Sequence, residues 1–188
     1  QLMAVVRDDV KRLDRLITDI SNASRLDAEL SRDRPRPVDL NRLLVDIVGV
    51  YETTAKPGDI PVVLTAPEQA LRVMGRDGPL GQVFRNLIDN ARSFSPAGGV
   101  VRVTLEDIGD DLPIRVRVED QGPGIPAENL ETVFQRFYTS RPKGAVFGSN
   151  SGLGLSIVRQ IVEAHGGRVH AENKAEGGAR FEIVFPAV

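Results

Sequence analysis

The segment that decides the fold is DQGPGIPAENLETVFQRFYTSRPKGAVFGSNSGLGL, residues 120–155. It contains two glycine-rich turns, Gly122-Pro-Gly124 and Ser151-Gly-Leu-Gly154; between them lie a short amphipathic stretch, expected to be helical, and a partly basic loop. The first turn follows an alternating run (residues 114–118) typical of a half-buried strand, and the second opens into residues 155–164, whose apolar spacing is that of a helix. A single glycine pair usually marks an ordinary turn, so the order and spacing of the two pairs carry the argument.

The second glycine turn has the chemistry of an anion site. Gly152 and Gly154 stand just ahead of a predicted helix N-terminus, where backbone N–H groups can approach an anion closely and the helix dipole favours negative charge. A phosphate group is the anion that we expect there. Asp120, at the end of the strand before the first turn, is a natural acceptor for an amino group such as that of adenine.

The bulk composition excludes several functional classes. The chain has 188 residues, enough for one domain with an appendage, and its 27% charged and 41% apolar residues are typical of a soluble globular protein. A net charge of -2 without a Lys/Arg block predicts no nucleic-acid partner. The absence of cysteine excludes disulfides, thiolate catalysis and zinc–sulfur sites, and the 2 histidines are too few for a His-based metal site. The sequence shows no apolar run of membrane-spanning length and no signal peptide.

A long helix is predicted at the start of the chain, over about residues 2–30. Its apolar positions alternate steps of four and three, the heptad spacing of a helix–helix seam: Val6, Val10, Leu13, Ile17, Ile20 and Ser24. This helix either packs on its own domain or forms half of a helical hairpin that pairs with a partner. We favour the hairpin, because a narrow seam needs another helix and nothing adjacent in sequence supplies one. Because the chain begins inside this pattern, we expect it to be part of a longer protein.

The rest of the chain predicts one α+β domain. The proline-rich residues 32–38 are expected to form a stiff, charged linker, which divides the chain into an N-terminal helix (1–31) and a domain (39–188). Apolar periodicity predicts helices over 40–54, 80–93 and from 155, and strands over 60–64, 71–74, 101–105, 114–118, 168–172 and 179–185. The expected architecture is a two-layer sandwich with helices on one face of a mixed, mainly antiparallel sheet.

Two asparagines four residues apart, Asn86 and Asn90, share one face of the helix predicted over residues 80–93. Asparagine is a mediocre helix former, and an isolated pair of this kind is more often a surface or back-bonded pair. Here we favour a functional role. The side-chain oxygen of asparagine suits Mg2+, which takes few protein ligands and completes its coordination with phosphate oxygens.

Four short motifs resemble, in order, the boxes of the GHKL (Bergerat) ATP-binding fold. They are Asn86-Leu-Ile-Asp-Asn90-Ala for the N box, Asp120-Gln-Gly122-Pro-Gly124-Ile for the G1 box, Phe134-Gln-Arg-Phe137 for the F box and Gly152-Leu-Gly154-Leu for the G2 box. With the leading helix, the set resembles a sensor histidine kinase of bacterial two-component systems over roughly residues 5–186. Residues 17–27 resemble the second helix of the dimerisation and histidine-phosphotransfer hairpin. Together with residues 90–95, they also resemble the ChvG-type envelope sensors of alphaproteobacteria.

The resemblance implies ATP and Mg2+ as cofactors and gives the motif residues their roles. Asn90 is implied to bind the Mg2+ that bridges the ATP phosphates. Asn86 is implied to lie in the same polar patch and to serve both catalysis and nucleotide binding. Asp120 is implied to accept the adenine amino group. The residues of the first turn that are implied to border the base are Gly122, Gly124 and Ile125.

The second turn and the loop before it are implied to surround the triphosphate. The residues implied at the helix start are Gly152, Leu153 and Gly154. Residues 138–151 correspond to the ATP lid, in which Arg141 and Lys143 are candidate phosphate contacts. Arg136, in the F box, is a candidate catalytic residue that reaches the phosphates or the phosphotransfer hairpin. A solvated surface position is the alternative for each of these three cations.

Three positions depart from the family pattern. Ser93 stands where the N box usually has a lysine, so we expect Arg92 or a lid cation to serve instead. Phe94 replaces the following tyrosine, which keeps an aromatic face but loses a hydroxyl donor. Asn150 replaces the first glycine of the G2 box, and asparagine tolerates the left-handed conformation better than most residues.

The family's phosphoacceptor histidine is implied to lie on the first hairpin helix, before residue 1. His165 precedes Gly166 at a predicted helix end, where a cation complements the helix dipole, and we expect a structural role for it. His170 lies in a predicted strand without acceptor-like context. We therefore expect the chain to bind ATP but not to phosphorylate itself in isolation. The implied partners are the first dimerisation helix, a second copy in the full-length protein and the receiver domain of a response regulator. The implied location is the cytoplasmic portion of an inner-membrane-anchored bacterial sensor.

Three functions compete. In the first, the γ-phosphoryl group of ATP passes to a histidine nitrogen, which needs positioning and charge neutralisation more than covalent chemistry by the protein. The second is a GHKL ATPase that hydrolyses ATP to drive a clamp. Such relatives carry a glutamate at the first N-box position, whereas Asn86 cannot take a proton from water. The third is a non-catalytic dimerisation and nucleotide-sensing module, and the presence of Asn90, Asp120 and the G2 glycines argues against a loss of nucleotide binding.

Overall fold

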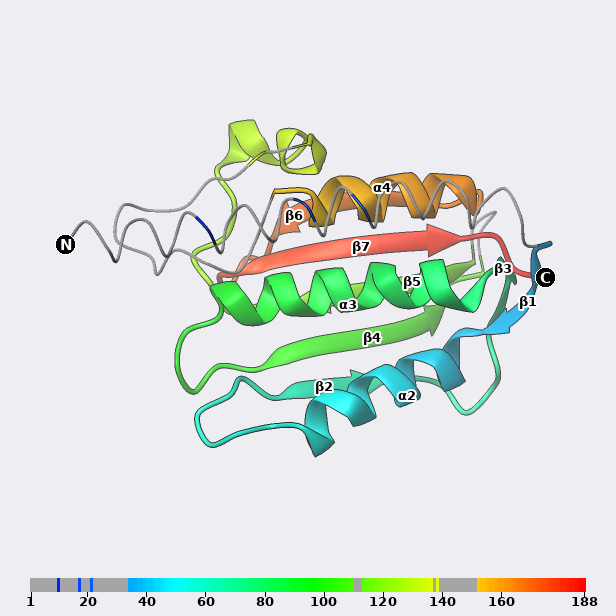
Figure 1. Cartoon of the computed structure of the whole chain (residues 1–188), viewed down its shortest axis with the longest axis horizontal. Helices are drawn as coiled ribbons and strands as arrows, with labels where there is room; N and C mark the ends of the chain where they lie inside the picture. Colours follow the sequence, from blue (N-terminus) through cyan, green and yellow to red (C-terminus); the bar gives the residue numbers. More distant parts are fainter. Residues whose placement is uncertain are drawn as a thin grey trace.

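Figure 1 shows the computed structural model of the chain, which describes residues 34–109, 113–136 and 152–188 together with Val10, Ile17, Ser21 and Tyr138. The helix predicted over residues 2–30 lies outside this part of the chain except at Val10, Ile17 and Ser21, which are helical.

The centre of the domain is a five-stranded sheet with the order β2-β4-β5-β7-β6. The strands are β2 (Val62–Thr65), β4 (Val101–Asp107), β5 (Ile114–Glu119), β6 (Arg168–Asn173) and β7 (Ala179–Phe185). The pairing of β2 with β4 is parallel, and the three other pairings are antiparallel. The predicted mixed, mainly antiparallel sheet is confirmed.

A second, two-stranded sheet pairs β1 (Arg36–Asp39) with β3 (Arg72–Gly75) in antiparallel register. The sequence placed residues 32–38 in a linker and did not anticipate β1. Proline is tolerated in a strand of this kind because an edge position needs no donor from its backbone nitrogen. The strand predicted over residues 71–74 is present as β3, but it belongs to this small sheet and not to the main one.

Three helices cover one face of the main sheet (Figure 1): α2 (Leu40–Thr53), α3 (Asp77–Phe94) and α4 (Gly154–Ala164). The side chain of Asp39 accepts a hydrogen bond from the backbone N–H of Arg42 at 3.2 Å and thereby caps the N-terminus of α2. Helix α3 begins at Asp77 and contains Pro79 in its first turn, where proline is well tolerated.

The hydrophobic core lies between these helices and the inner face of the sheet. The largest fully buried side chains include Phe84, Leu87, Ile161, Phe181 and Phe185. Each buried side chain of this size stabilises the fold by roughly 1.5–3 kcal/mol relative to an exposed one. Because α3 and α4 both contribute to this core, their relative position is fixed by packing.

The stretch after the first glycine turn forms two single 3-10 turns, η1 (Ala127–Asn129) and η2 (Thr132–Phe134), and not the short amphipathic helix expected from the sequence. Runs of 3-10 helix are commonly this short. The position of these turns depends on a few buried side chains. Phe134 is one of them: its ring lies edge-on to Phe181, with centroids 6.0 Å apart, under the guanidinium of Arg159 at 4.3 Å.

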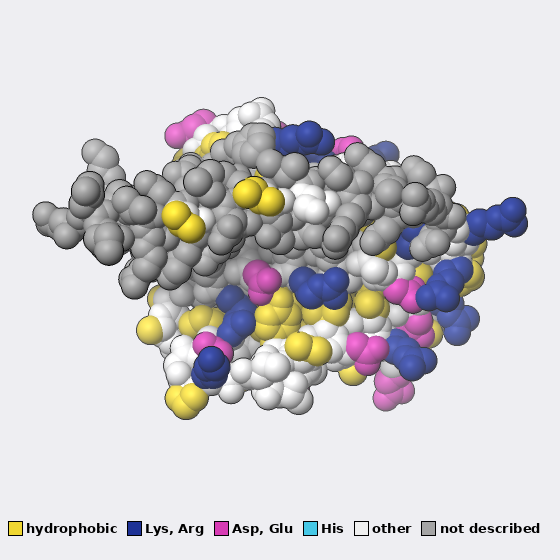
Figure 2. Space-filling view, viewed as in Figure 1, with side chains coloured by type: hydrophobic (Ala, Val, Ile, Leu, Met, Phe, Trp, Pro, Cys, Tyr) yellow, Lys and Arg dark blue, Asp and Glu magenta, His cyan; other side chains and the backbone are white. Residues whose placement is uncertain are grey.

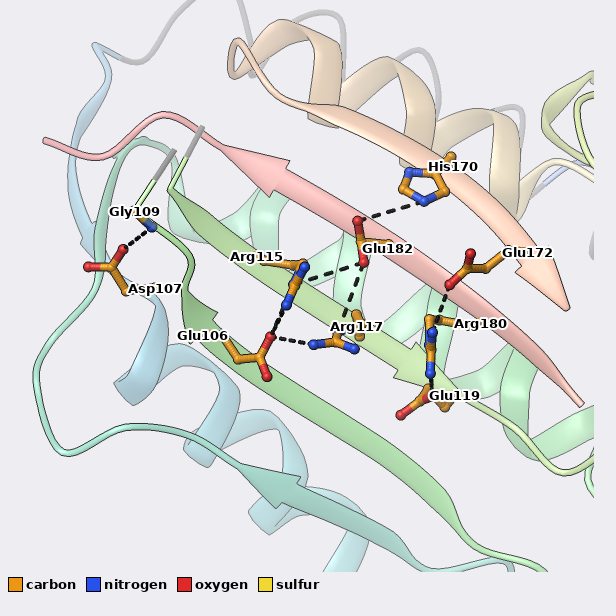
Figure 3. A network of polar contacts seen from close by, with 10 residues as sticks. All are labelled: Glu106, Asp107, Gly109, Arg115, Arg117, Glu119, His170, Glu172, Arg180 and Glu182. Atoms are coloured by element: carbon orange, nitrogen blue, oxygen red, sulfur yellow. Dashed lines mark hydrogen bonds and ion pairs between the residues drawn. The ribbon is translucent and has the colours of Figure 1, made fainter. Parts of the chain in front are cut away.

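The other face of the sheet carries a network of cross-strand ion pairs (Figure 3). Arg180 bonds Glu119 and Glu172, each at 2.8 Å, and Arg115 and Arg117 both bond Glu106. These two arginines lower the pKa of Glu106 through their hydrogen bonds. Opposite charges are thus paired within the sheet, an arrangement that stabilises neighbouring strands.

The surface over the helices is also of mixed character. On the described part of this face, acidic, basic and apolar side chains are interspersed (Figure 2). Within the ranges that the structure describes, no helix combines the length and apolarity needed to cross a bilayer.

Candidate nucleotide site

Asp120, directly after β5, is held in a fixed orientation by the backbone. Only 3% of its surface is exposed. Its Oδ1 accepts hydrogen bonds from the N–H groups of Gly122, at 2.8 Å, and Ala179, at 3.0 Å. No hydrogen bond between described residues involves its Oδ2. One oxygen of the carboxylate is therefore committed to the fold, while the other can accept from a ligand.

Burial dominates the electrostatics of this carboxyl group. Desolvation raises the pKa of Asp120 above its ordinary value, whereas the two backbone N–H groups and the charge of Lys174 act in the opposite direction. A desolvated acceptor forms a stronger hydrogen bond than an exposed one, because water does not compete for it. Asp120 therefore suits the role predicted for it, as acceptor for an amino group.

The glycines of the G1 turn stand where a side chain would collide with the backbone or with a neighbour. A Cβ on Gly122 would lie 2.6 Å from the carbonyl oxygen of Phe94, at the end of α3. Gly124 adopts φ +80°, a conformation that favours glycine, and a Cβ there would lie 2.7 Å from Oδ1 of Asn173. The turn is thus packed closely against α3 on one side and against β6 on the other.

The G2 turn leads into α4, as predicted. Gly152 adopts φ +78°, and α4 begins at Gly154. No side chain of the described residues caps this helix start. The first backbone N–H groups of a helix lack partners within the helix. The start of α4 therefore offers donors and a positive dipole end to an anion, as the phosphate hypothesis requires.

Helix α3 contacts both glycine turns. Nδ2 of Asn86 donates a hydrogen bond to the carbonyl oxygen of Gly154 at 3.2 Å, while Phe94, two helical turns later, contacts Gly122. Asn90 lies midway between them, four residues from each. Residues four apart share a helix face. The N, G1 and G2 boxes are therefore brought together along one side of α3.

Arg92 does not lie on this side of α3, so of the two replacements predicted for the N-box lysine, Arg92 or a lid cation, Arg92 does not suit the role. Its guanidinium lies 5.3 Å from the ring centroid of Tyr51, donates to the carbonyl of Ile60 at 3.0 Å and pairs with Asp59 at 3.4 Å. These contacts connect α3 to α2 and to the loop that precedes β2. A position two residues after Asn90 points to another side of a helix, which explains the outcome.

The remaining candidate residues lie at the edge of the described part of the chain or outside it. Arg136 is exposed, just after η2. Arg141 and Lys143 lie outside the described residues, as does most of the predicted lid over 138–151. Leu153 is buried at the start of α4, and Ile125 packs against the core. Within the described ranges, no group of three or more His, Cys, Asp and Glu residues could hold a metal ion.

His165 has the structural role predicted for it, but as a neutral side chain and not as a cation. The residue is 7% exposed; Nδ1 donates to the carbonyl of Ile161 at 2.7 Å, and Nε2 accepts from the N–H of Arg76 at 3.2 Å. Burial lowers its pKa, and the charge of Arg76 acts in the same direction. His165 thereby joins the end of α4 to the loop before α3.

Sequence reasoning missed Asn173, the last residue of β6. Its side chain bonds the backbone of Ile125 in the G1 turn through both its amide groups, at 2.7 and 2.6 Å. The two residues are 48 positions apart, and no periodic pattern or motif in the sequence connects them. Only the position of β6 at the edge of the main sheet shows the contact.

Helices over a mixed sheet and glycine turns around an asparagine-bearing helix are the features of an ATP-binding domain of the GHKL class. Residues 75–188 match the family described as Histidine kinase-, DNA gyrase B-, and HSP90-like ATPase, and the chain belongs to this family.

Individual relatives place the chain among sensor histidine kinases. The Sensor protein ChvG of Rhizobium meliloti is 49% identical over 201 residues, which cover 100% of this chain and 34% of that protein. The chain thus spans about a third of the curated relatives that it matches. The resemblance to sensor histidine kinases is confirmed, and its narrower form, to ChvG-type sensors of alphaproteobacteria, agrees with this relative.

Solved structures agree. Full-length ShkA in complex with AMPPNP has a TM-score of 0.77 and 28% identity, over 98% of this chain and 38% of that one. Histidine kinase ThkA in complex with the response regulator protein TrrA has a TM-score of 0.72 and 29% identity, over 94% and 48% of the two chains. The predicted α+β fold with the GHKL architecture is thereby confirmed.

Proposed function

We propose that the chain is the ATP-binding catalytic portion of a sensor histidine kinase, which transfers the γ-phosphoryl group of ATP to a histidine on a dimerisation hairpin. The observation that carries this proposal is the convergence of three motifs along α3. Asn86 contacts Gly154 in the G2 box, and Phe94 contacts Gly122 in the G1 box. Asp120 stands at the G1 end as a buried acceptor. An adenine nucleotide placed along this side of α3 has its base at Asp120 and its phosphates at the start of α4.

Mg2+ fits the asparagine-bearing side of α3. We assign Asn90 as its protein ligand, because an amide oxygen is a hard donor and Mg2+ usually completes its coordination with phosphate oxygens and water. When bound, the ion neutralises charge that develops on the transferred phosphoryl group. Arg136, Arg141 and Lys143 are the cations that we assign to the triphosphate, since Arg92 is engaged elsewhere.

Phosphoryl transfer is favoured over hydrolysis by the chemistry of Asn86. A hydrolase of this family needs a general base for water, and the amide of Asn86 has no proton-accepting function. Its Nδ2 is also engaged, as a donor to Gly154 at 3.2 Å. This residue therefore organises the phosphate site and does not activate water.

The acceptor histidine is assigned to the first helix of the hairpin, because the histidines of this chain do not suit the role. His165 is buried and bonded at both ring nitrogens, and His170 lies 3.7 Å from Glu182 on the outer face of the sheet (Figure 3). The hairpin itself is supported by Val10 and Ile17, two predicted seam residues that are 51% and 65% exposed. An exposed apolar seam is stabilised by a second helix.

The partners and location follow from the same assignment. We propose that the full-length protein is a homodimer joined through this hairpin, that its phosphoryl group passes to the receiver domain of a response regulator, and that this chain is the cytoplasmic portion of a membrane-anchored sensor. The ThkA–TrrA complex supports the choice of partner, since ThkA is a structural neighbour. The paired charges on the outer sheet face support a protein partner over nucleic acid.

The decisive experiment is radiolabelled phosphorylation of a chain extended by the first hairpin helix. Incubation with γ-labelled ATP and Mg2+ should give an acid-labile, base-stable phosphohistidine, and Asp120→Asn should lose most of the label. Protein that binds ATP but does not become labelled would favour a nucleotide-sensing module. Steady release of inorganic phosphate without labelled protein would favour the ATPase.

A further inference from the structure

Asn173 is bonded to both polar backbone groups of a single residue in the G1 turn. Its Oδ1 accepts from the N–H of Ile125 at 2.7 Å, and its Nδ2 donates to the carbonyl oxygen of Ile125 at 2.6 Å. The side-chain amide thereby copies the pairing that a neighbouring strand would offer. The need for one acceptor and one donor also fixes the orientation of the amide.

The same side chain packs against Gly124. This glycine adopts φ +80°, and a Cβ built on it would lie 2.7 Å from Oδ1 of Asn173. The conformation favours a residue without Cβ, and the space beside it is already filled by the asparagine amide. Asn173 therefore fixes the backbone conformation of the turn and its close packing against β6.

The opposite end of the turn is held by the other strand of the same hairpin. The N–H of Ala179, in β7, donates to Oδ1 of Asp120 at 3.0 Å, and the N–H of Asp120 donates to the carbonyl of Ala179 at 3.0 Å. The β6–β7 hairpin thus contacts the G1 box at two points. Ala179 bonds Asp120, and Asn173 bonds Ile125. Residues 121–124 lie between these points.

We propose that Asn173 is a positioning residue for the adenine-binding turn, which sets nucleotide affinity through the backbone of Gly124 and Ile125. This inference rests on the proposed function, because the turn affects affinity only where it borders a nucleotide. Asn173 is itself exposed, so the loss of its two bonds costs little folding free energy compared with a core substitution. Nucleotide affinity and fold stability are therefore separable readouts.

The test is calorimetric titration of ADP into the 188-residue chain and into Asn173→Ala. Loss of both hydrogen bonds should weaken binding about tenfold, while the unfolding midpoint of the nucleotide-free protein changes little. Asn173→Asp should also bind more weakly than the wild type, because its second oxygen cannot donate to the carbonyl of Ile125. Glu172→Gln is the matched control: this adjacent side chain bonds Arg180 on the outer sheet face and should leave the affinity unchanged.

A double-mutant cycle with Gly124→Ala tests whether Asn173 and Gly124 affect nucleotide affinity together. If Asn173 only stabilised the fold, the two substitutions would change affinity independently. In the single variant Gly124→Ala the new Cβ meets Oδ1 of Asn173, whereas in the Asn173→Ala background that obstacle is gone. The affinity loss of the double variant should therefore be smaller than the sum of the two single losses. Equal affinity of Asn173→Ala and wild type, a lowered unfolding midpoint with unchanged affinity, or fully additive losses would each overturn the positioning role. If the wild type binds no adenine nucleotide, the proposed function fails first and this inference fails with it.

Discussion

Asn86 and Gly154 are in direct contact: Nδ2 of the asparagine donates to the carbonyl oxygen of the glycine at 3.2 Å. A Cβ on Gly154 would lie 3.9 Å from the same nitrogen, so the first residue of α4 packs against the side-chain amide of Asn86. Since the first turn of α4 is the candidate phosphate site, this bond fixes its position relative to Asn90 on the same helix as Asn86.

Asn86→Ala should weaken the binding of ATP more than that of adenosine. The bond to Gly154 positions the phosphate end of the site, and the loss of one hydrogen bond costs about 1 kcal/mol, or roughly fivefold in affinity. Calorimetric titration with each ligand measures the two effects. Gln82→Ala, one helical turn earlier on α3, is the control and should bind both ligands normally; equal losses for ATP and adenosine in Asn86→Ala would contradict the assignment.

Asp120→Asn should abolish most of the affinity for adenine nucleotides while preserving the fold. The asparagine oxygen can still accept from the N–H groups of Gly122 and Ala179, whereas its amide nitrogen presents a donor to the amino group of adenine. A mismatch of two buried donors costs roughly 1–3 kcal/mol, or about five- to 150-fold in affinity. Calorimetry with ADP measures the loss, and near-UV circular dichroism checks the fold. Unchanged affinity would remove Asp120 from the base site.

Nucleotide affinity should also fall as the solution becomes acidic. Burial raises the folded-state pKa of Asp120 above the ordinary value of 3.8, so its carboxylate takes up a proton as the pH falls through the raised value. Protonation turns an acceptor into a donor and weakens the bond to the base, while the folding cost of the buried charge disappears in the same window. ADP titrations at a series of pH values test this. Asp120→Asn should lack this pH dependence, and a wild type with the same pH profile as the variant would contradict it.

Gly178→Ala should lower both stability and nucleotide affinity more than Gly177→Ala. Both glycines have positive φ, +89° and +99°, so both substitutions carry backbone strain. Only at Gly178 would the Cβ also collide with the carbonyl oxygen of Asp120, at 2.2 Å, whereas the space at Gly177 is open. Thermal unfolding and ADP titration of the two variants isolate the collision from the strain. Equal effects would show that Gly178 does not position Asp120.

His165→Ala should lower the free energy of unfolding by about 2–4 kcal/mol at neutral pH, because it opens a cavity and removes the hydrogen bond from the N–H of Arg76 to Nε2. Burial lowers the folded-state pKa of His165 below its ordinary value of 6.5. The stability from the neutral ring is therefore fully present above pH 6.5 and is lost as the pH falls through the lowered folded value. Urea unfolding at a series of pH values measures both. His170→Ala, half-exposed, should change stability by less than about 0.5 kcal/mol, and a loss as large as that of His165→Ala would contradict this account.

Elements with a strong period were predictable from the sequence. β4, β5 and β7 alternate strictly between buried and outward positions, and the apolar side of α3 is the side that enters the core. The placement of Asp120 at a strand end and of Gly152 and Gly154 at a helix start also followed from local patterns. In each case the information lies within a few residues of the element itself.

The remainder depended on contacts between distant segments. β1 exists because Arg36–Asp39 pairs with β3, a partner that a proline-rich stretch does not reveal. The direction of Arg92 is set by Tyr51 and Asp59, and the role of Asn173 by Ile125. None of these contacts leaves a periodic signal, since each depends on how the elements pack.

The central claim, a nucleotide site along α3, is tested most directly by titrating ATP with and without Mg2+ into the wild type and Asn90→Ala. We predict that the wild type binds ATP and that Mg2+ strengthens this binding. In Asn90→Ala, Mg2+ should have little effect, while adenosine binds as in the wild type. A wild type that binds no ATP under either condition would contradict the account.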